Sequence, residues 1–164
     1  MSEPEPPPPQ PNEHAAVLER MAQMMQFTPQ ARALGLELTH IDGARVWGRV
    51  PYRADLVGDP DTGVIAGGVV TTFLDQLCGI AAVAAMETPS AVATIDLRID
   101  YMRAAEPGLA LQAEAHCIRL TANVAFVRAT AYENSPDDPV ALATAAFMVN
   151  TNASRGPYKA RKQP

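Results

Sequence analysis

The sequence predicts an α+β fold in which an antiparallel sheet wraps around one long central helix. Three observations lead to this prediction. The 18-residue run from Val69 to Met86 is mainly apolar and carries a single charge, Asp75; four long segments of alternating polarity follow it, and two shorter ones precede it. A helix with almost no polar face needs apolar partners on most sides. Packing against one flat sheet would leave half of its apolar surface exposed to water. A curled sheet supplies those partners.

The first half of the chain begins with an amphipathic helix over His14–Phe27, in which apolar residues recur at helical spacing. Thr28-Pro29 ends this helix and starts a short turn through Leu34. Asp42-Gly43 is a two-residue hairpin signal, so we expect two antiparallel strands on either side of it, at Gly35–Ile41 and Ala44–Pro51.

In the second half, a loop rich in Gly, Asp and Pro (52–68) leads into the apolar helix, which Thr88-Pro89 ends. In the first strand after it, Ile95, Leu97, Ile99 and Tyr101 alternate with Thr94, Asp96, Arg98 and Asp100, which predicts one buried and one polar face. The four later strands are expected at Ala91–Arg103, Leu109–Leu120, Val124–Glu133 and Val140–Asn150.

Both ends of the chain differ from the middle in composition. Six of the 15 prolines fall within the first 11 positions, so residues 1–13 are predicted to form a disordered, partly polyproline II arm. Residues 155–164 carry four basic side chains and two prolines, which predicts a flexible basic tail. Residues 14–154 then form one domain of ordinary size.

Composition argues against several classes of function. The predicted domain carries nine arginines against 15 acidic residues, and this negative net charge argues against nucleic-acid binding. An aspartate inside a membrane helix costs about 2.5 to 3.5 kcal/mol, so we expect no membrane span. Two cysteines in apolar patterns and no signal peptide predict reduced thiols and a cytoplasmic protein, and no spacing of Cys and His suggests a metal site.

Asp75 is the most informative single residue. A lone carboxylate in an apolar helix is paired, lies at an interface or takes part in chemistry, and residue chemistry alone leaves these alternatives open. Gly67 and Gly68 start the same helix, where unpaired backbone N–H groups can hold a developing oxyanion and the missing side chains permit close approach. Because Gly67 and Asp75 are eight residues apart, about 12 Å along a helix, a site that uses both is expected to combine two chains.

The run GVIAGGVVTTFLDQLCGIAA resembles the signature of hotdog-fold thioesterases of the phenylacetic-acid-degradation (PaaI) and 4-hydroxybenzoyl-CoA type, usually G-x-x-H-G-G followed by an acidic residue on the central helix. The segment IDLRIDYMRAA resembles the strand of that family that ends in Tyr-x-Arg-Pro-Ala. The resemblance extends over roughly residues 27–151. It implies a hotdog fold and hydrolysis of an acyl-CoA by a homodimer or a dimer of dimers, with no cofactor beyond the coenzyme A of the substrate.

Carried over by position, the resemblance places the catalytic carboxylate on Asp75, as general base toward water or as nucleophile. It places the amide that polarises the thioester oxygen on Gly67, and a hydroxyl that helps to hold the water on Thr94. Arg103 and Arg119 match positions that are often basic in relatives and could meet the phosphates of CoA. An ordinary solvated arginine is the alternative for each.

The sequence departs from the family motif at two positions that would lie near the substrate. The family His is Ala66 here, and the Asn that commonly precedes the motif has Asp59 as its nearest counterpart, which would add a second negative charge near Asp75. The alternative to hydrolysis is therefore a weakly catalytic module that binds acyl-CoA or another hydrophobic ligand on the same fold. A hotdog hydratase is a third class, whose Asp/His motif this sequence lacks.

Overall fold

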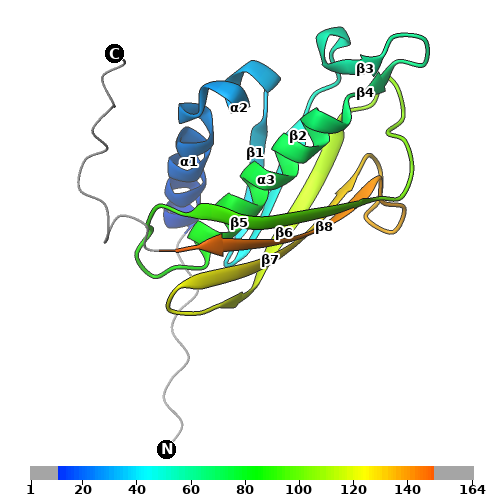
Figure 1. Ribbon diagram of the computed structural model, residues 1–164. Coiled ribbons are helices and arrows are strands. Elements are labelled where there is room, and N and C mark those ends of the chain that lie inside the picture. Colours follow the sequence, from blue (N-terminus) through cyan, green and yellow to red (C-terminus); the bar gives the residue numbers. More distant parts are fainter. Residues whose placement is uncertain (1–10, 150–164) are drawn as a thin grey trace, which may run out of the picture.

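One long helix, α3 (Gly67–Ala84), lies in the hollow of a six-stranded antiparallel sheet (Figure 1). The computed structural model describes residues 11–149. The strand order in the sheet is β1-β2-β6-β7-β8-β5. The strands are β1 (Glu37–Asp42), β2 (Arg45–Val50), β5 (Ala93–Tyr101), β6 (Leu111–Leu120), β7 (Val124–Tyr132) and β8 (Ala141–Met148). The α+β prediction, with a sheet wrapped around a central helix, is confirmed.

The apolar sequence of α3 is explained by its burial. Ten of its 18 residues are buried, and Phe73, Leu74 and Leu77 are fully enclosed. The helix is long and apolar enough to cross a membrane by length and composition alone, but 56% of it is buried inside this fold. The sheet therefore takes up the apolar surface that the sequence displays.

Two helices precede the sheet, α1 (Pro11–Phe27) and α2 (Pro29–Leu34). Met21 and Met25 of α1 are buried in the core, whereas Met24 is 43% exposed. Gly35 ends α2 in the left-handed conformation, at φ 70°. Helix α1 begins three residues before the predicted start of the domain, and the remainder of the predicted arm and the tail after residue 149 lie outside the described residues.

The β1–β2 hairpin has a different register from the predicted one. Asp42 pairs with Arg45 and Ile41 with Val46, so the two-residue loop is Gly43-Ala44 and not Asp42-Gly43. Gly43 has φ 53°, which glycine adopts at no steric cost. In this register, Ile41 lies opposite Val46 on the face toward α3. At the turn end of the hairpin, the acidic Asp42 lies opposite the basic Arg45.

The long loop before α3 contains more structure than the sequence predicts. A 3-10 turn, Ala54–Leu56, leads into a small hairpin of β3 (Val57–Asp59) and β4 (Val64–Ile65). The backbone N–H of Ala66 donates to the carbonyl of Leu56 over 2.9 Å, and a Cβ on Gly58 would lie only 2.7 Å from Ala66 Cα. This close packing fixes the chain where α3 begins.

Candidate active site

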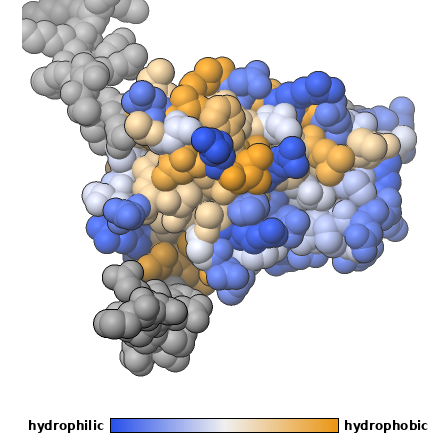
Figure 2. Space-filling view, turned by 90° about the horizontal axis from the view of Figure 1, so that it is seen from below, coloured by the Kyte–Doolittle hydropathy of each residue, from blue (hydrophilic) through white to orange (hydrophobic). Residues whose placement is uncertain are grey.

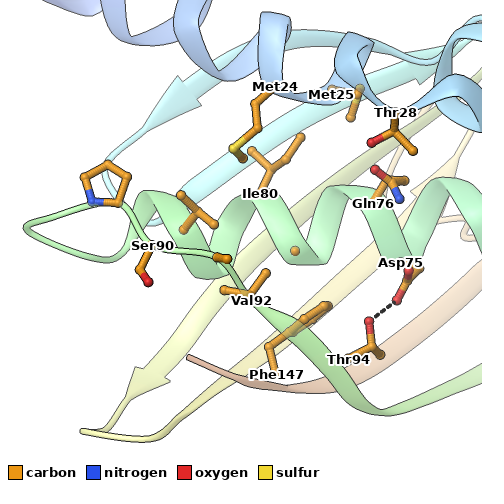
Figure 3. A pocket seen from close by; sticks show the side chains of 14 residues that line it. Met24, Met25, Thr28, Asp75, Gln76, Ile80, Ser90, Val92, Thr94 and Phe147 are labelled. Carbon is orange, nitrogen blue, oxygen red and sulfur yellow. Dashed lines mark hydrogen bonds between the residues drawn. The ribbon is translucent and has the colours of Figure 1, made fainter. Parts of the chain in front are cut away.

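Asp75 and Thr94 face each other between α3 and the edge strand β5. The hydroxyl of Thr94 donates a hydrogen bond to Asp75 Oδ1 over 2.9 Å, shown as a dashed line in Figure 3. Asp75 is half-buried, so its carboxylate is held by the protein yet remains in reach of a ligand. The structure thus brings together two residues that the sequence analysis selected from segments 19 positions apart.

The orientation of Thr94 differs from the sequence prediction, which placed it on the polar face with Asp96. A β-bulge interrupts the pairing of β5 with β8: Thr94 lies opposite Phe147, whereas Asp96 lies opposite Ala146. Phe147 is buried and points toward α3, and directly opposed residues share a face. The extra residue, Ile95, therefore turns Thr94 to the inner face of the sheet, toward Asp75.

A cavity of about 520 Å³ opens beside the Asp75 carboxylate. Its walls come from α1, α3, the segment 89–92 and the ends of β5 and β8 (Figure 3). Apart from Asp75, Thr94, Gln76, Thr28 and Ser90, the lining is apolar or glycine: Met24, Met25, Gly79, Ile80, Val83, Pro89, Ala91, Val92 and Phe147. A mainly apolar cavity with one carboxylate at its wall suits a ligand with a hydrophobic chain and a reactive polar group.

Gly67 is the first residue of α3, after the cap residue Ala66. The hydroxyl of Tyr101 donates to the Gly67 carbonyl over 2.8 Å, and that of Thr71 donates to it over 3.0 Å. A Cβ on Gly67 would lie 3.3 Å from the Tyr101 oxygen, whereas nothing lies within 4 Å of a Cβ on Gly68. The Gly67 carbonyl is thus held by two hydroxyls, and the space beside Gly68 is open.

Tyr101 is a residue whose contact the sequence analysis missed. It lies at the end of β5 and connects the sheet edge to the start of α3, 34 positions away in sequence. The sequence pointed to Tyr101 only through its position in the segment that resembles the family strand. A phenol in an alternating strand otherwise indicates only a half-buried ring.

The predicted second charge, Asp59, is engaged in its own turn. Its carboxylate accepts from the Thr62 hydroxyl over 2.7 Å and from the Asp61 N–H over 3.1 Å, and these bonds hold the pKa of Asp59 below its usual value. Asp59 does not line the cavity beside Asp75. The geometry accounts for this carboxylate as the cap of the β3–β4 turn.

The two arginines proposed for CoA phosphates lie in different environments. Arg103 forms ion pairs with Glu133, at 2.5 Å, and with Asp138, at 3.1 Å. Arg119 is exposed on β6, and its side chain has no carboxylate within 4 Å among residues 11–149. The guanidinium of Arg103 is therefore already paired with carboxylates of the fold, whereas that of Arg119 is available to a ligand.

Cys78 lies on α3 one turn beyond Asp75 and is fully buried. Burial, followed by the nearby charge of Asp75, raises the pKa of the Cys78 thiol to about 12. A thiol with that pKa is protonated at neutral pH and is a poor nucleophile. Asp75 is therefore the remaining candidate for a reactive group beside the cavity.

Comparison with known proteins concerns the whole fold. The family model of the thioesterase superfamily matches residues 62–139. The medium/long-chain acyl-CoA thioesterase YigI of Salmonella typhimurium is 31% identical over 134 residues, which cover 74% of this chain and 85% of that protein.

Solved structures extend the likeness to nearly the whole described fold. A protein from Pseudomonas aeruginosa is 38% identical with a TM-score of 0.74, covering 80% of this chain and 98% of the other. A phenylacetic acid degradation-related protein from Ralstonia eutropha has the same fold, at 24% identity and a TM-score of 0.66, covering 79% and 98% of the two chains.

Proposed function

Because the chain belongs to the thioesterase superfamily and has its hotdog fold, we propose that it hydrolyses acyl-CoA thioesters to a free acid and CoA. The observation that carries the proposal is the Asp75 carboxylate, held by Thr94 at the wall of a largely apolar cavity. A carboxylate in that position can activate water next to a bound acyl group.

In the proposed reaction, Asp75 removes a proton from water while the water oxygen attacks the thioester carbon. The hydrogen bond from Thr94 occupies one carboxylate oxygen and leaves the other for the water. The tetrahedral intermediate then collapses, the carbon–sulfur bond breaks, and the proton on Asp75 passes to the departing CoA thiolate. The second route is direct attack by Asp75 on the thioester carbon, followed by hydrolysis of the resulting anhydride.

The backbone N–H of Gly67 is proposed to stabilise the oxyanion. Two hydroxyls bond the Gly67 carbonyl and hold its position at the helix start, and the first N–H groups of a helix are unpaired and at its positive end. Gly67 and Asp75 of one chain are about 12 Å apart along α3. We therefore propose that each site combines Asp75 of one protomer with Gly67 of its partner.

The exposed edge of β5 supports this shared site. Among residues 11–149, β5 pairs only with β8, so its other side presents unpaired backbone groups. Ile95, Tyr101 and Met102 are each more than half exposed along it. Figure 2 shows hydrophobic residues gathered on the face seen from below. A second copy at the β5 edge would cover Ile95, Tyr101 and Met102. We therefore propose a cytoplasmic homodimer, or a dimer of dimers, as the working form.

The panel of substrates is the decisive experiment. Release of free thiol is followed with a chromogenic reagent for short, medium and long aliphatic acyl-CoAs and for aryl-CoAs. We expect hydrolysis of aliphatic medium- to long-chain esters, because the cavity beside Asp75 is largely apolar and YigI is named for such substrates. Binding of the esters without thiol release from any of them would instead support the binding-module alternative, which the replacement of the family His by Ala66 favours.

Chain-length preference is expected to depend on Gly79, which lines the cavity one turn beyond Asp75. A Cβ there would lie 3.5 Å from Phe147, an ordinary contact, so alanine fits and a leucine side chain extends into the cavity. We expect Gly79→Leu to lower kcat/KM for dodecanoyl-CoA by roughly tenfold or more and to leave butyryl-CoA nearly unchanged.

Gly79→Ala is the matched control. It should keep the native chain-length profile, and it should stabilise the protein by up to about 1 kcal/mol because alanine is the better helix former. Equal losses on both substrates in Gly79→Leu would show that the acyl chain does not occupy this cavity.

A further inference from the structure

The outer face of the sheet, which points away from α3, carries a row of basic side chains. In the strand register, Arg45 of β2 lies directly opposite His116 of β6, and His116 lies directly opposite Arg128 of β7. Directly opposed side chains share a face and are separated by about 5 Å at Cβ. Three neighbouring strands therefore present two arginines and a histidine side by side.

These arginines lack the partners that other arginines of the chain have. Within residues 11–149, Arg49, Arg53, Arg98 and Arg103 each form an ion pair, whereas Arg45 and Arg128, like Arg20 and Arg32, have no carboxylate within 4 Å. Asp42 of β1 lies opposite Arg45 in the strand register but forms no ion pair with it. Arg119, also unpaired in this part of the chain, lies opposite Phe126 further along the same face. In a protein of net charge −5, this arrangement attracts an anion.

The basic row borders a hollow of about 200 Å³, and a second hollow of about 300 Å³ lies further along the strands. Trp47 lines both hollows, and it pairs in register with Glu114, one row from Arg45. The second hollow is lined by aromatic rings and an amide: His40, Trp47, Tyr132 and Gln112. The rows of His116 and Gln112 lie four positions apart on β6, about 13 Å along a strand.

The two hollows differ in the chemistry that they recognise. Arginines and a histidine suit phosphate oxygens. The aromatic hollow suits a flat heterocycle, and because Gln112 Nε2 donates to the Glu133 carbonyl, its side-chain oxygen is left to accept. Glu114 lines the first hollow on the side toward the second one, where it can accept a hydrogen bond from an amine or hydroxyl and repels a phosphate. The order along the sheet is thus phosphate site, acceptor and ring site.

We propose that this face binds an adenine nucleotide, with its phosphates on Arg45, His116 and Arg128 and its base against the rings of Trp47 and Tyr132. The ligand is either a free adenine nucleotide or the nucleotide end of a CoA molecule, which share this chemistry. The site lies on the opposite face of the sheet from Asp75, so it does not rest on the proposed hydrolysis.

Trp47 is the single tryptophan of the chain, so its fluorescence reports directly on the site. The protein is titrated with ADP, with CoA, with adenosine and with sodium pyrophosphate at constant ionic strength. We expect saturable quenching by ADP or CoA, and binding by adenosine and pyrophosphate that is weaker by about tenfold or more, because each fills one hollow only. Saturation by CoA alone identifies CoA as the source, saturation by ADP alone identifies free nucleotide, and equal affinity for both shows that the shared ADP group is the part that binds.

Arg128→Gln is expected to weaken this binding by about tenfold or more, the value of one charge-assisted hydrogen bond. Arg49→Gln is the matched control, because Arg49 is on the same strand as Arg45 and on the same face but pairs with Glu37. It should bind nucleotide within about twofold of the native protein.

Three outcomes overturn the proposal. The first is the absence of any saturable signal with ADP or CoA, and the second is an equal loss of affinity in Arg49→Gln and Arg128→Gln, which indicates diffuse attraction. The third is a Trp47 signal that changes with protein concentration and not with nucleotide, which indicates that a second copy covers the face. In all three cases hydrolysis at the Asp75 site is still measured independently by thiol release.

Discussion

Replacing Asp75 by asparagine is expected to lower kcat for acyl-CoA hydrolysis by about 10²- to 10⁴-fold, with KM changed by less than about threefold. Asparagine has the size of aspartate, and its side-chain oxygen can still accept from the Thr94 hydroxyl. The substitution therefore removes the basicity of the group and little else. The loss corresponds to roughly 3 to 5 kcal/mol of transition-state stabilisation, measured by thiol release on the best substrate of the panel.

Cys78→Ala is the matched control for this prediction. Cys78 lies one turn from Asp75 on the same helix, and its thiol, with a pKa raised to about 12 mainly by burial, is protonated at neutral pH. We expect kcat to stay within about threefold of the native value. Native kcat in Asp75→Asn together with a large loss in Cys78→Ala would assign the chemistry to the thiol and contradict the proposal.

A single-turnover reaction in ¹⁸O-labelled water separates the two roles of Asp75. A general base leaves the carboxylate oxygens of the protein unlabelled, because water attacks the thioester directly. A nucleophile forms an anhydride, and attack of water on its aspartyl carbonyl places label in Asp75. Mass analysis of the peptide that contains Asp75 distinguishes these results.

Most of the fold could be predicted because burial leaves a periodic trace in the sequence. The α3 run is apolar on nearly all sides, and the inner faces of β6, β7 and β8 alternate with outer polar residues, which determines the element types. The hairpin register was missed because Asp42-Gly43 is a local signal. The pairing of Ile41 with Val46 is a cross-strand contact that overrides it.

Asp75 and Gly67 could be selected from the sequence because each departs from its surroundings, one as a charge in an apolar run and one as a glycine at a helix start. The geometry around them could not be predicted. The bulge at Ile95 that turns Thr94 toward Asp75 depends on pairing with β8, 50 residues later. The partners of Arg103 come from a hairpin 30 or more positions away, and nothing near Arg103 in sequence identifies them.

Glu133→Gln is expected to have the largest effect on stability. Glu133 is 4% exposed, and its carboxylate accepts two hydrogen bonds from Arg103 and one from the Glu106 N–H over 2.7 Å. A glutamine presents an NH₂ group to one of these donors and leaves the Arg103 charge short of a partner. Because Arg103 is about a third exposed and keeps Asp138, we expect a loss of about 2 to 3 kcal/mol in the free energy of unfolding.

The pH dependence identifies the cause of that loss. Burial alone would raise the pKa of Glu133, but the hydrogen bonds from Arg103 and Glu106 outweigh it and hold the pKa below the usual 4.5. A lowered folded-state pKa gives stabilisation that is complete above pH 4.5 and disappears as the pH falls through the folded-state value. The difference between native protein and Glu133→Gln in urea unfolding, at one protein concentration, should therefore be largest near neutral pH and shrink below that value.

Asp138→Asn provides the control, because Asp138 bonds the same guanidinium but is 78% exposed. Water screens that pair, so its loss should cost less than about 1 kcal/mol at any pH. If the two variants are equally destabilised, burial of Glu133 is not what makes its ion pair important. If Glu133→Gln is destabilised by the same amount at acid and neutral pH, the loss comes from packing and not from the charge.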